Sequence, residues 1–146
     1  MPESEGLTIT RTFKAPRELV FEAWTQPQHF AEWWGGKQVV VPADSIEMDV
    51  RAGGTWKATM VLPENSGEIN WVGEYVEVDP PERLVLTLSD GSSDEREIVT
   101  VVLTEVEGGT QMVCSQTGGH LTPQQYGEAK QGYEGFFDAM QELVER

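Results

Sequence analysis

The sequence predicts an α+β fold in which a curved antiparallel sheet of six or seven strands is wrapped on one long C-terminal helix. The first observation is the segment 122–146, where Thr122 and Gln125 have the spacing of a capping box and Pro123 suits the first helical position. The second is that most of the residues from 38 to 116 are strand-like. The apolar residues of the helix recur at spacings of three and four and form one wide stripe: Tyr126, Ala129, Tyr133, Phe136, Phe137, Met140, Leu143 and Val144. A helix with such a stripe must lie on another element, and the sheet is the partner that this chain offers.

The residues before the sheet predict one strand and two short helices. Residues 7–13 alternate with a period of two, which is typical of a strand. Residues 15–24 then predict a helix that opens on an Ala-Pro pair. Thr25 and Gln28 form a second capping-box pattern, which predicts another short helix that ends at the glycines 35–36.

The central part of the chain predicts six further strands. Turn signals separate them, among them the glycine pairs at 53–54 and 108–109 and the two prolines at 80–81. The glycine pairs join strands to strands, so we interpret them as hairpin turns and not as phosphate-binding loops, and we expect no cofactor. The predicted strands span residues 45–51, 55–62, 68–78, 83–88, 98–106 and 110–117.

The composition narrows the classes of partner. The 25 acidic residues outnumber the 10 basic ones and give a formal net charge of −15. Nucleic acids and anionic membranes are therefore poor partners, because phosphate binding needs clustered Lys and Arg. The length of 146 residues favours a single domain over residues 1–146.

The single cysteine, Cys114, excludes an intramolecular disulfide and favours a reducing, cytoplasmic location. Residues 1–6 lack the pattern of a signal peptide and are expected to be flexible. No apolar run is long enough for a bilayer, so membrane insertion is not expected.

Several stretches together resemble the bacterial branch of the family named for homology to the activator of the heat-shock protein 90 ATPase. This family belongs to the wider START-like (SRPBCC, or birch-pollen-allergen-like) helix-grip superfamily. At residue 133 the family pattern usually has Trp where this chain has Tyr133. The resemblance is carried by ITRTFKAPRELVFEAWT (9–25), FAEWWG (30–35), DVRAGGTW (49–56), GEYVEVDPPERLV (73–85), EGGT (107–110) and GYEGFF (132–137).

The resemblance implies a helix-grip fold with a cavity between the sheet and the C-terminal helix, but it does not imply one reaction. The eukaryotic co-chaperone of the family has an additional N-terminal domain that this sequence lacks, so a chaperone partner is not expected. Tryptophan-rich edges often form interfaces, and the sequence leaves a homodimer open as an alternative.

The aromatic and apolar residues on the inward faces are the candidate cavity lining, and the competing interpretation of each is an ordinary packed core. Trp33 and Trp34 point about 100° apart on a helix, so they cannot face the same cavity equally. The candidate lining residues are Trp33, Trp34, Trp56, Met60, Trp71, Tyr75, Leu84, Leu86, Tyr133, Phe136, Phe137 and Met140.

The polar candidates are few. Arg11, Glu74 and His120 are the polar groups that we expect at the cavity, and the strand phase leaves open whether Glu74 or its neighbours face inward. His29 and Glu32 lie one helical turn apart, but two ligands do not make a metal site, so no metal is expected. No residue is assigned a catalytic role.

These observations predict three functions in a fixed order of preference. The first is non-catalytic binding of a small hydrophobic or amphipathic molecule, such as a lipid, in the cavity. The second is a protein-interaction module, chaperone-associated or stress-related, which an exposed apolar patch would favour. The third is a cyclase- or hydrolase-type enzyme that uses the same cavity with an inward acid or His120 as its general acid or base.

Overall fold

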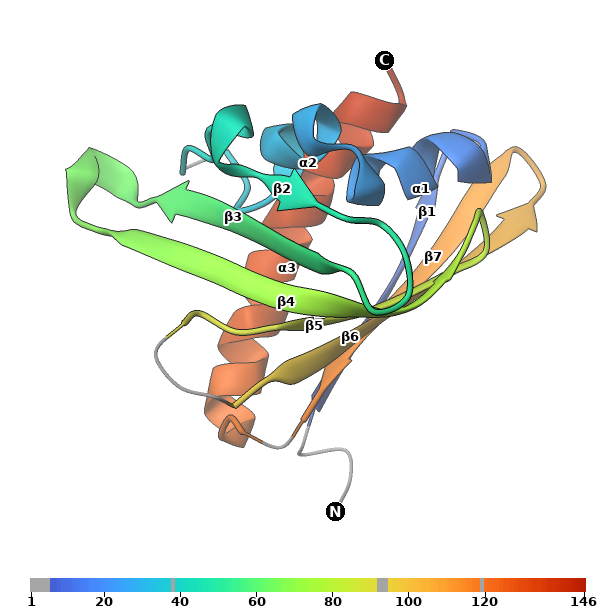
Figure 1. Cartoon of the computed structure of the whole chain (residues 1–146). Coiled ribbons are helices and arrows are strands. Elements are labelled where there is room, and N and C mark those ends of the chain that lie inside the picture. The colour runs from blue at the N-terminus through green and yellow to red at the C-terminus, as the bar shows by residue number, and fades with distance from the viewer. Residues whose placement is uncertain (1–5, 38, 92–94, 119) are drawn as a thin grey trace.

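In the computed structural model, a seven-stranded antiparallel sheet curves around the long helix α3 (Figure 1). The structure describes residues 6–37, 39–91, 95–118 and 120–146. This arrangement confirms the predicted α+β class and its helix-grip architecture. The strands are β1 (Gly6–Phe13), β2 (Glu47–Met48), β3 (Thr55–Val61), β4 (Glu68–Asp79), β5 (Arg83–Leu88), β6 (Glu97–Val106) and β7 (Gly109–Thr117), and the helices are α1 (Arg17–Thr25), α2 (Pro27–Trp33) and α3 (Pro123–Val144).

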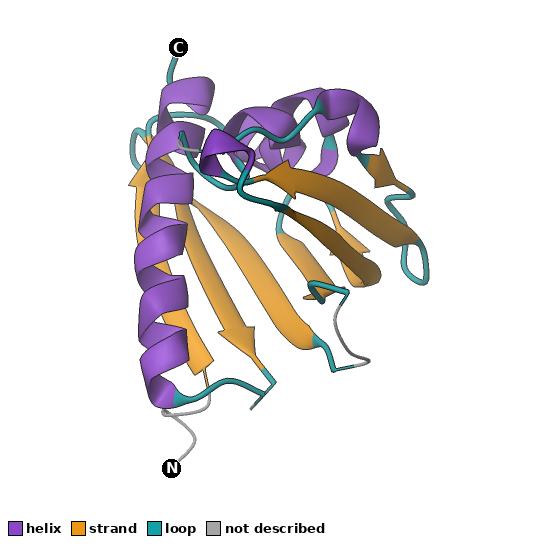
Figure 2. Ribbon diagram, turned by 90° about the vertical axis from the view of Figure 1, so that its left-hand side faces the viewer, coloured by secondary structure: helices purple, strands orange, loops and turns teal. Residues whose placement is uncertain are grey.

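The strand order β1-β7-β6-β5-β4-β3-β2 places the first strand of the chain beside the last. Ile9 of β1 pairs with Cys114 of β7, and β6 and β7 form a hairpin that turns at Gly108. The helices α1 and α2 leave the end of β1 and lie together beside the C-terminal part of α3 (Figure 2). The sheet, α3 and this pair of helices therefore surround one interior.

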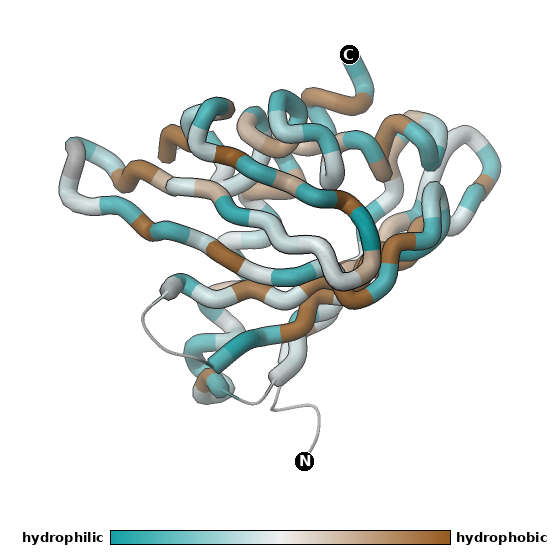
Figure 3. Tube along the Cα trace, in the orientation of Figure 1, coloured by the Kyte–Doolittle hydropathy of each residue, from teal (hydrophilic) through white to brown (hydrophobic). Residues whose placement is uncertain are grey.

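Hydrophobic and hydrophilic residues alternate along parts of the strands (Figure 3), and burial alternates with the same period of two in β3 and β7. In β7 the buried residues are Thr110, Met112, Cys114 and Gln116. Burial raises the pKa of the Cys114 thiol to about 12, so this cysteine is a neutral core residue at physiological pH. Gln116 is polar and also faces the interior. The interior at this end of β7 is therefore more polar than at Met112 and Cys114.

Two expected elements differ from the structure. Residues 45–51 do not form a full strand, because β2 contains only Glu47 and Met48. The backbone is in a 3-10 turn at Ala43–Ser45 just before β2, and the N–H of Arg51 bonds the carbonyl of Asp49 just after it, so turns limit the strand on both sides. The expected flexible N-terminus is residues 1–6; residues 1–5 lie outside the described residues, and Gly6 belongs to β1.

The two capping boxes had different outcomes. At α3 the box forms: the Thr122 hydroxyl accepts from the Gln125 N–H at 3.1 Å, and the Gln125 side chain accepts from the Thr122 N–H at 2.8 Å. At α2 the predicted helix forms but the predicted box does not. Thr25 is the last residue of α1 and its hydroxyl donates to the Phe21 carbonyl at 2.9 Å, so Gln26 is the N-cap of α2 without a side-chain bond.

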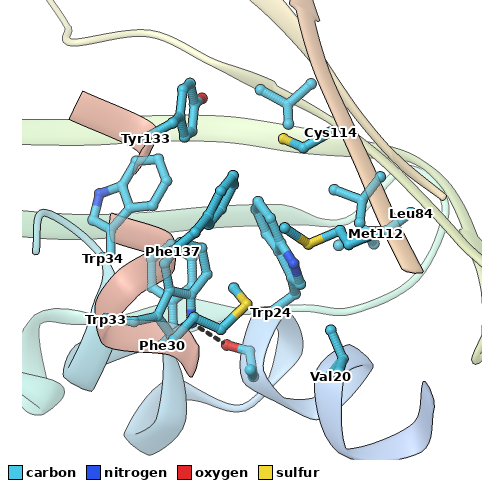
Figure 4. Packing of buried hydrophobic residues seen from close by; sticks show 14 of the residues in the cluster. Val20, Trp24, Phe30, Trp33, Trp34, Leu84, Met112, Cys114, Tyr133 and Phe137 are labelled. Atoms are coloured by element: carbon cyan, nitrogen blue, oxygen red, sulfur yellow. Dashed lines mark hydrogen bonds between the residues drawn. The ribbon is translucent and has the colours of Figure 1, made fainter. Parts of the chain in front are cut away.

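An aromatic cluster from α1, α2 and α3 forms the centre of the core (Figure 4). The ring centroids of Trp33 lie 4.7 Å from Trp24, 5.1 Å from Phe30 and 6.0 Å from Phe137. The Trp33 indole N–H donates to the Ala23 carbonyl at 2.7 Å, so its polar atom is satisfied inside the core. The cluster thereby fixes α2 against both α1 and α3.

The glycines inside α3 allow a first prediction. A Cβ built at Gly127 meets nothing within 4 Å, so close approach of another backbone does not explain this glycine. Gly127→Ala is expected to raise the free energy of unfolding by about 1 kcal/mol, because alanine loses less backbone entropy in a helix. Urea denaturation followed by circular dichroism measures it.

The matched control for this prediction is Gly53→Ala in the turn before β3. A Cβ at Gly53 also meets nothing within 4 Å, but the backbone there has φ +87°, which L-residues rarely adopt. This variant is expected to be destabilised. Equal shifts in the two variants would contradict the assignment of the Gly127 effect to helix propensity.

Candidate functional site

A cavity of about 350 Å³ lies between the sheet and the N-terminal half of α3. Its walls come from β4, β5, β6, β7, α3, the loops beside them and Trp34 just after α2, so it is built from segments far apart in the sequence. The lining residues are Trp34, Trp71, Leu88, Ser89, Asp90, Glu95, Glu97, Gln116, His120, Leu121, Ala129, Gly132, Tyr133 and Phe136.

Four aromatic side chains form one wall of the cavity. Trp34, which caps the C-terminal end of α2, is at its centre. Its ring centroid lies 5.8 Å from Trp71 of β4, 5.2 Å from Phe136 and 6.3 Å from Tyr133. Tyr133 and Phe136 are three residues apart on α3 and therefore face the same side. Each ring of this wall therefore contacts at least one other ring of it.

Polar side chains meet at the other side of the cavity in one hydrogen-bonded chain, which we call the polar relay: Tyr133, Gln116, Glu97 and His120. The Tyr133 hydroxyl donates to Gln116 Oε1 at 2.6 Å, and Gln116 Nε2 donates to Glu97 Oε1 at 3.3 Å. Glu97 Oε2 lies 3.0 Å from His120 Nδ1 and accepts from the His120 backbone N–H at 3.3 Å.

The relay has one direction of hydrogen bonding. Burial raises the pKa of Tyr133 well above its ordinary value, and the nearby Cys114 and Glu97 add to the effect, so the Tyr133 hydroxyl keeps its proton and donates. The Oε1 of Gln116 accepts this bond, which turns the amide nitrogen of Gln116 toward Glu97. The relay therefore directs its hydrogen bonds toward Glu97.

Gly118 makes room for the Glu97 carboxylate. A Cβ at Gly118 would overlap Glu97 Oε2, and the backbone has φ +151° there. The loop after β7 can therefore pass beside the carboxylate only because residue 118 has no side chain.

The structure places the predicted lining residues in two groups. Trp34, Trp71, Tyr133 and Phe136 line the cavity, and the other eight predicted residues do not. Of those eight, Trp56, Tyr75 and Leu86 border a separate space of only about 10 Å³, which is too small for a ligand. The remaining five pack in the core: Trp33, Met60, Leu84, Phe137 and Met140. The alternation that turns a side chain inward does not say whether it meets another side chain or a cavity.

The three predicted polar groups also separate. His120 lines the cavity and belongs to the polar relay. Arg11 lies outside the lining, because it pairs with Glu134 at 2.9 Å and Asp138 at 2.8 Å and so ties β1 to α3. Glu74 is exposed, since its neighbours in β4 at positions 73 and 75 are the ones that face inward.

Glu97 and Gln116 are the functional candidates that the sequence analysis did not name. Glu97 is the first residue of β6 and lies one position before the strand expected at 98–106. It is in phase with the buried Val99 and Val101. Extending the expected strand by one residue, to position 97, would have predicted an inward-facing carboxylate. This signal in the sequence could have identified Glu97.

The described residues give two further results about the class of site. No group of three or more His, Cys, Asp or Glu side chains among them is placed to hold a metal ion. Within the same part of the chain, no helix combines the length and the apolar character needed to span a bilayer.

The sequence profile of the family described as "Activator of Hsp90 ATPase homolog 1-like protein" matches residues 14–145. The match includes the three helices, the strands β2 to β7 and every residue that lines the cavity. The chain belongs to this family. A comparison with curated proteins gives no match.

Solved structures share the fold of this AHSA1-like chain over nearly its whole length. A Chromobacterium violaceum protein is 24% identical with a TM-score of 0.85, and the alignment covers 100% of this chain and 99% of the other. A Nitrosomonas europaea protein is 21% identical with a TM-score of 0.83, covering 99% and 96%. The AHSA1-like protein of Aeromonas hydrophila is 21% identical with a TM-score of 0.80, covering 97% and 95%. At these identities the likeness establishes the fold.

Within the AHSA1-like fold, Tyr133 connects the two sides of the cavity. Its ring stacks on Phe137 with a centroid distance of 5.6 Å, while its hydroxyl begins the polar relay. A tryptophan at this position would keep an aromatic ring, but its N–H is on the five-membered ring, closer to the backbone than a phenol hydroxyl. The phenol therefore gives this chain a donor that reaches Gln116.

Proposed function

We propose that this AHSA1-like protein binds a small amphipathic molecule in the cavity between the sheet and α3, without converting it chemically. The observation that carries the proposal is the combination of an aromatic wall and one polar relay around about 350 Å³ of space. Binding sites for small molecules are commonly cavities of this size with mostly apolar walls and a few convergent polar groups. The apolar part of the ligand would lie on Trp34 and Trp71, and its polar part would face Glu97.

The interaction-module alternative has less support. Large hydrophobic side chains that are exposed among the described residues are the valines and isoleucine Val40, Val76, Ile98 and Val106, and none of them is aromatic. Ile98 and Val106 lie near opposite ends of β6. Single exposed aliphatic residues are normal on protein surfaces and do not indicate a docking face.

The enzyme alternative is favoured by one observation, the contact of 3.0 Å between Glu97 Oε2 and His120 Nδ1. A carboxylate that holds Nδ1 of an imidazole leaves Nε2 to accept a proton, which is the arrangement of a general base. If a bound molecule disappears over time and a new product forms in the mixture, the enzyme alternative is favoured over binding. Retention of the intact molecule supports binding without chemical conversion.

The binding proposal is tested by closing the cavity from α3. A Cβ at Gly132 meets nothing within 4 Å, and this residue lines the cavity. Gly132→Phe is expected to lower the affinity for the neutral fluorescent probe N-phenyl-1-naphthylamine at least about tenfold, because the ring occupies the space of the ligand. Titration of the probe by fluorescence measures the dissociation constant.

Gly127→Phe is the matched control for this test. Gly127 lies on the same helix, its Cβ also meets nothing within 4 Å, and it is outside the cavity lining. Wild-type affinity in this variant shows that a phenylalanine on α3 has no general effect. Equal binding by both variants would contradict the location of the ligand. Mass spectrometry of molecules released on denaturation from protein purified from its own host identifies the ligand class.

A further inference from the structure

The polar side of the cavity carries negative charge. Asp90, Glu95 and Glu97 contribute carboxylates to the lining, while no lysine or arginine is among the described residues that form it. His120 is the one lining residue of the described set that can carry a positive charge. An anionic ligand would meet repulsion here, and a cationic one would meet attraction.

Glu97 is the carboxylate that decides the chemistry, because it is the most deeply buried of the three. The residue is 7% exposed, whereas Asp90 and Glu95 are both exposed. Burying a carboxylate is costly unless a positive group or strong donors compensate it. Among the described residues, the ion-pair partner of Glu97 is His120 and not a lysine or an arginine.

The hydrogen bonds that the described residues make to Glu97 leave capacity for a ligand. Its Oε1 accepts from Gln116 at 3.3 Å, and its Oε2 accepts from the His120 backbone at 3.3 Å and contacts the imidazole at 3.0 Å. Two of these three contacts are longer than a typical N–H···O bond. A carboxylate offers about four acceptor positions and binds ionised donors most strongly. An ammonium group at the cavity would provide such a donor.

The aromatic wall suits the same ligand. Faces of Trp, Tyr and Phe attract cations through the ring quadrupole, and Trp does so best. Trp34 and Trp71 meet with an interplanar angle of 83°, so they form two walls of a corner. Tyr133 belongs both to this wall and to the polar relay that includes Glu97, so the rings and the carboxylate face one cavity.

We propose that the ligand of this cavity is a cationic amphipathic amine, with its ammonium group held by Glu97 and its apolar part on the Trp34–Trp71 wall. This inference rests on the proposed binding function and specifies its substrate class. It assigns the selectivity for charge to one residue, Glu97.

The test compares three probes that share a phenylalkyl body: 2-phenylethylamine, 2-phenylethanol and 3-phenylpropionate. At neutral pH these are a cation, a neutral molecule and an anion. Isothermal titration is expected to give an affinity for the amine at least about tenfold above that for the alcohol, because a charge-assisted hydrogen bond replaces a neutral one. The anion is expected to bind weakest.

Glu97→Gln is the decisive variant, since glutamine keeps the shape of the side chain and one acceptor oxygen while it removes the charge. It is expected to abolish the preference for the amine over the alcohol, because the charge that selects the cation is gone. Glu74→Gln is the control, because it removes an exposed carboxylate outside the cavity and lowers the net negative charge equally. It is expected to keep the preference.

The outcomes separate this inference from the binding proposal. Equal affinities of wild type for the amine and the alcohol would overturn the cationic ligand, and an amine preference that survives in Glu97→Gln would overturn its assignment to Glu97. In either case, binding of N-phenyl-1-naphthylamine would leave the cavity as a binding site. Failure of that neutral probe and of all three phenylalkyl probes to bind would overturn both.

Discussion

Trp33→Ala is expected to lower the free energy of unfolding by about 4 kcal/mol, in the range found for large aromatic residues removed from cores. The side chain is 0% exposed and touches rings from α1, α2 and α3, including Trp24 at 4.7 Å. Truncation would leave a large void and would also leave the Ala23 carbonyl without its 2.7 Å hydrogen bond. Because typical domains are stable by only about 5–15 kcal/mol, much of the total would be lost.

Urea denaturation followed by far-ultraviolet circular dichroism measures this effect without relying on tryptophan fluorescence. Trp71→Ala is the control, since Trp71 is half-buried at the cavity wall and its removal enlarges a space that already exists. A loss of less than about 2 kcal/mol is expected there. Similar losses in the two variants would show that the assignment of Trp33 to the core and Trp71 to the cavity is wrong.

Local signals in the sequence were sufficient for most of the elements. The capping box of α3 depends on residues three positions apart, and the hairpin at Gly108 depends on a turn between adjacent strands, so both can be predicted without tertiary structure. The box at Thr25 has the same letters, but the hydroxyl there bonds back to Phe21 within α1. Whether a threonine caps the next helix or ends the previous one is decided by packing.

The candidate site was harder to predict because its parts meet only in three dimensions. The polar relay joins residues 97, 116, 120 and 133 through the register of β6 with β7 and the position of α3. For the aromatic residues, the sequence does not show which of them line the cavity and which pack in the core. Trp33 and Trp34 are adjacent, and one lies in the core while the other lines the cavity. Apolar patterning identifies inward residues, but the distance between sheet and helix decides which of them meet empty space.

Gly73→Ala is expected to destabilise the protein by about 3 kcal/mol through overpacking. Gly73 lies in β4 opposite Trp56 of β3, and a Cβ there would overlap both the Thr87 carbonyl oxygen and Trp56 Nε1. These two atoms are the partners of a 2.9 Å hydrogen bond that links β3 to β5. The added methyl group would have to break this bond or move backbone atoms. Thermal and urea denaturation of the variant measure the loss.

The effect should extend to the cavity, because Trp56 contacts Trp34 with a centroid distance of 6.1 Å. Gly73→Ala is therefore expected to weaken binding of N-phenyl-1-naphthylamine at temperatures where the variant is still folded. Gly132→Ala is the control: it adds the same methyl group, but into open space within a helix. It is expected to raise stability, so the same substitution has opposite signs at the two positions. A Gly73→Ala protein as stable as wild type would contradict the close contact between the Trp56 indole and Gly73.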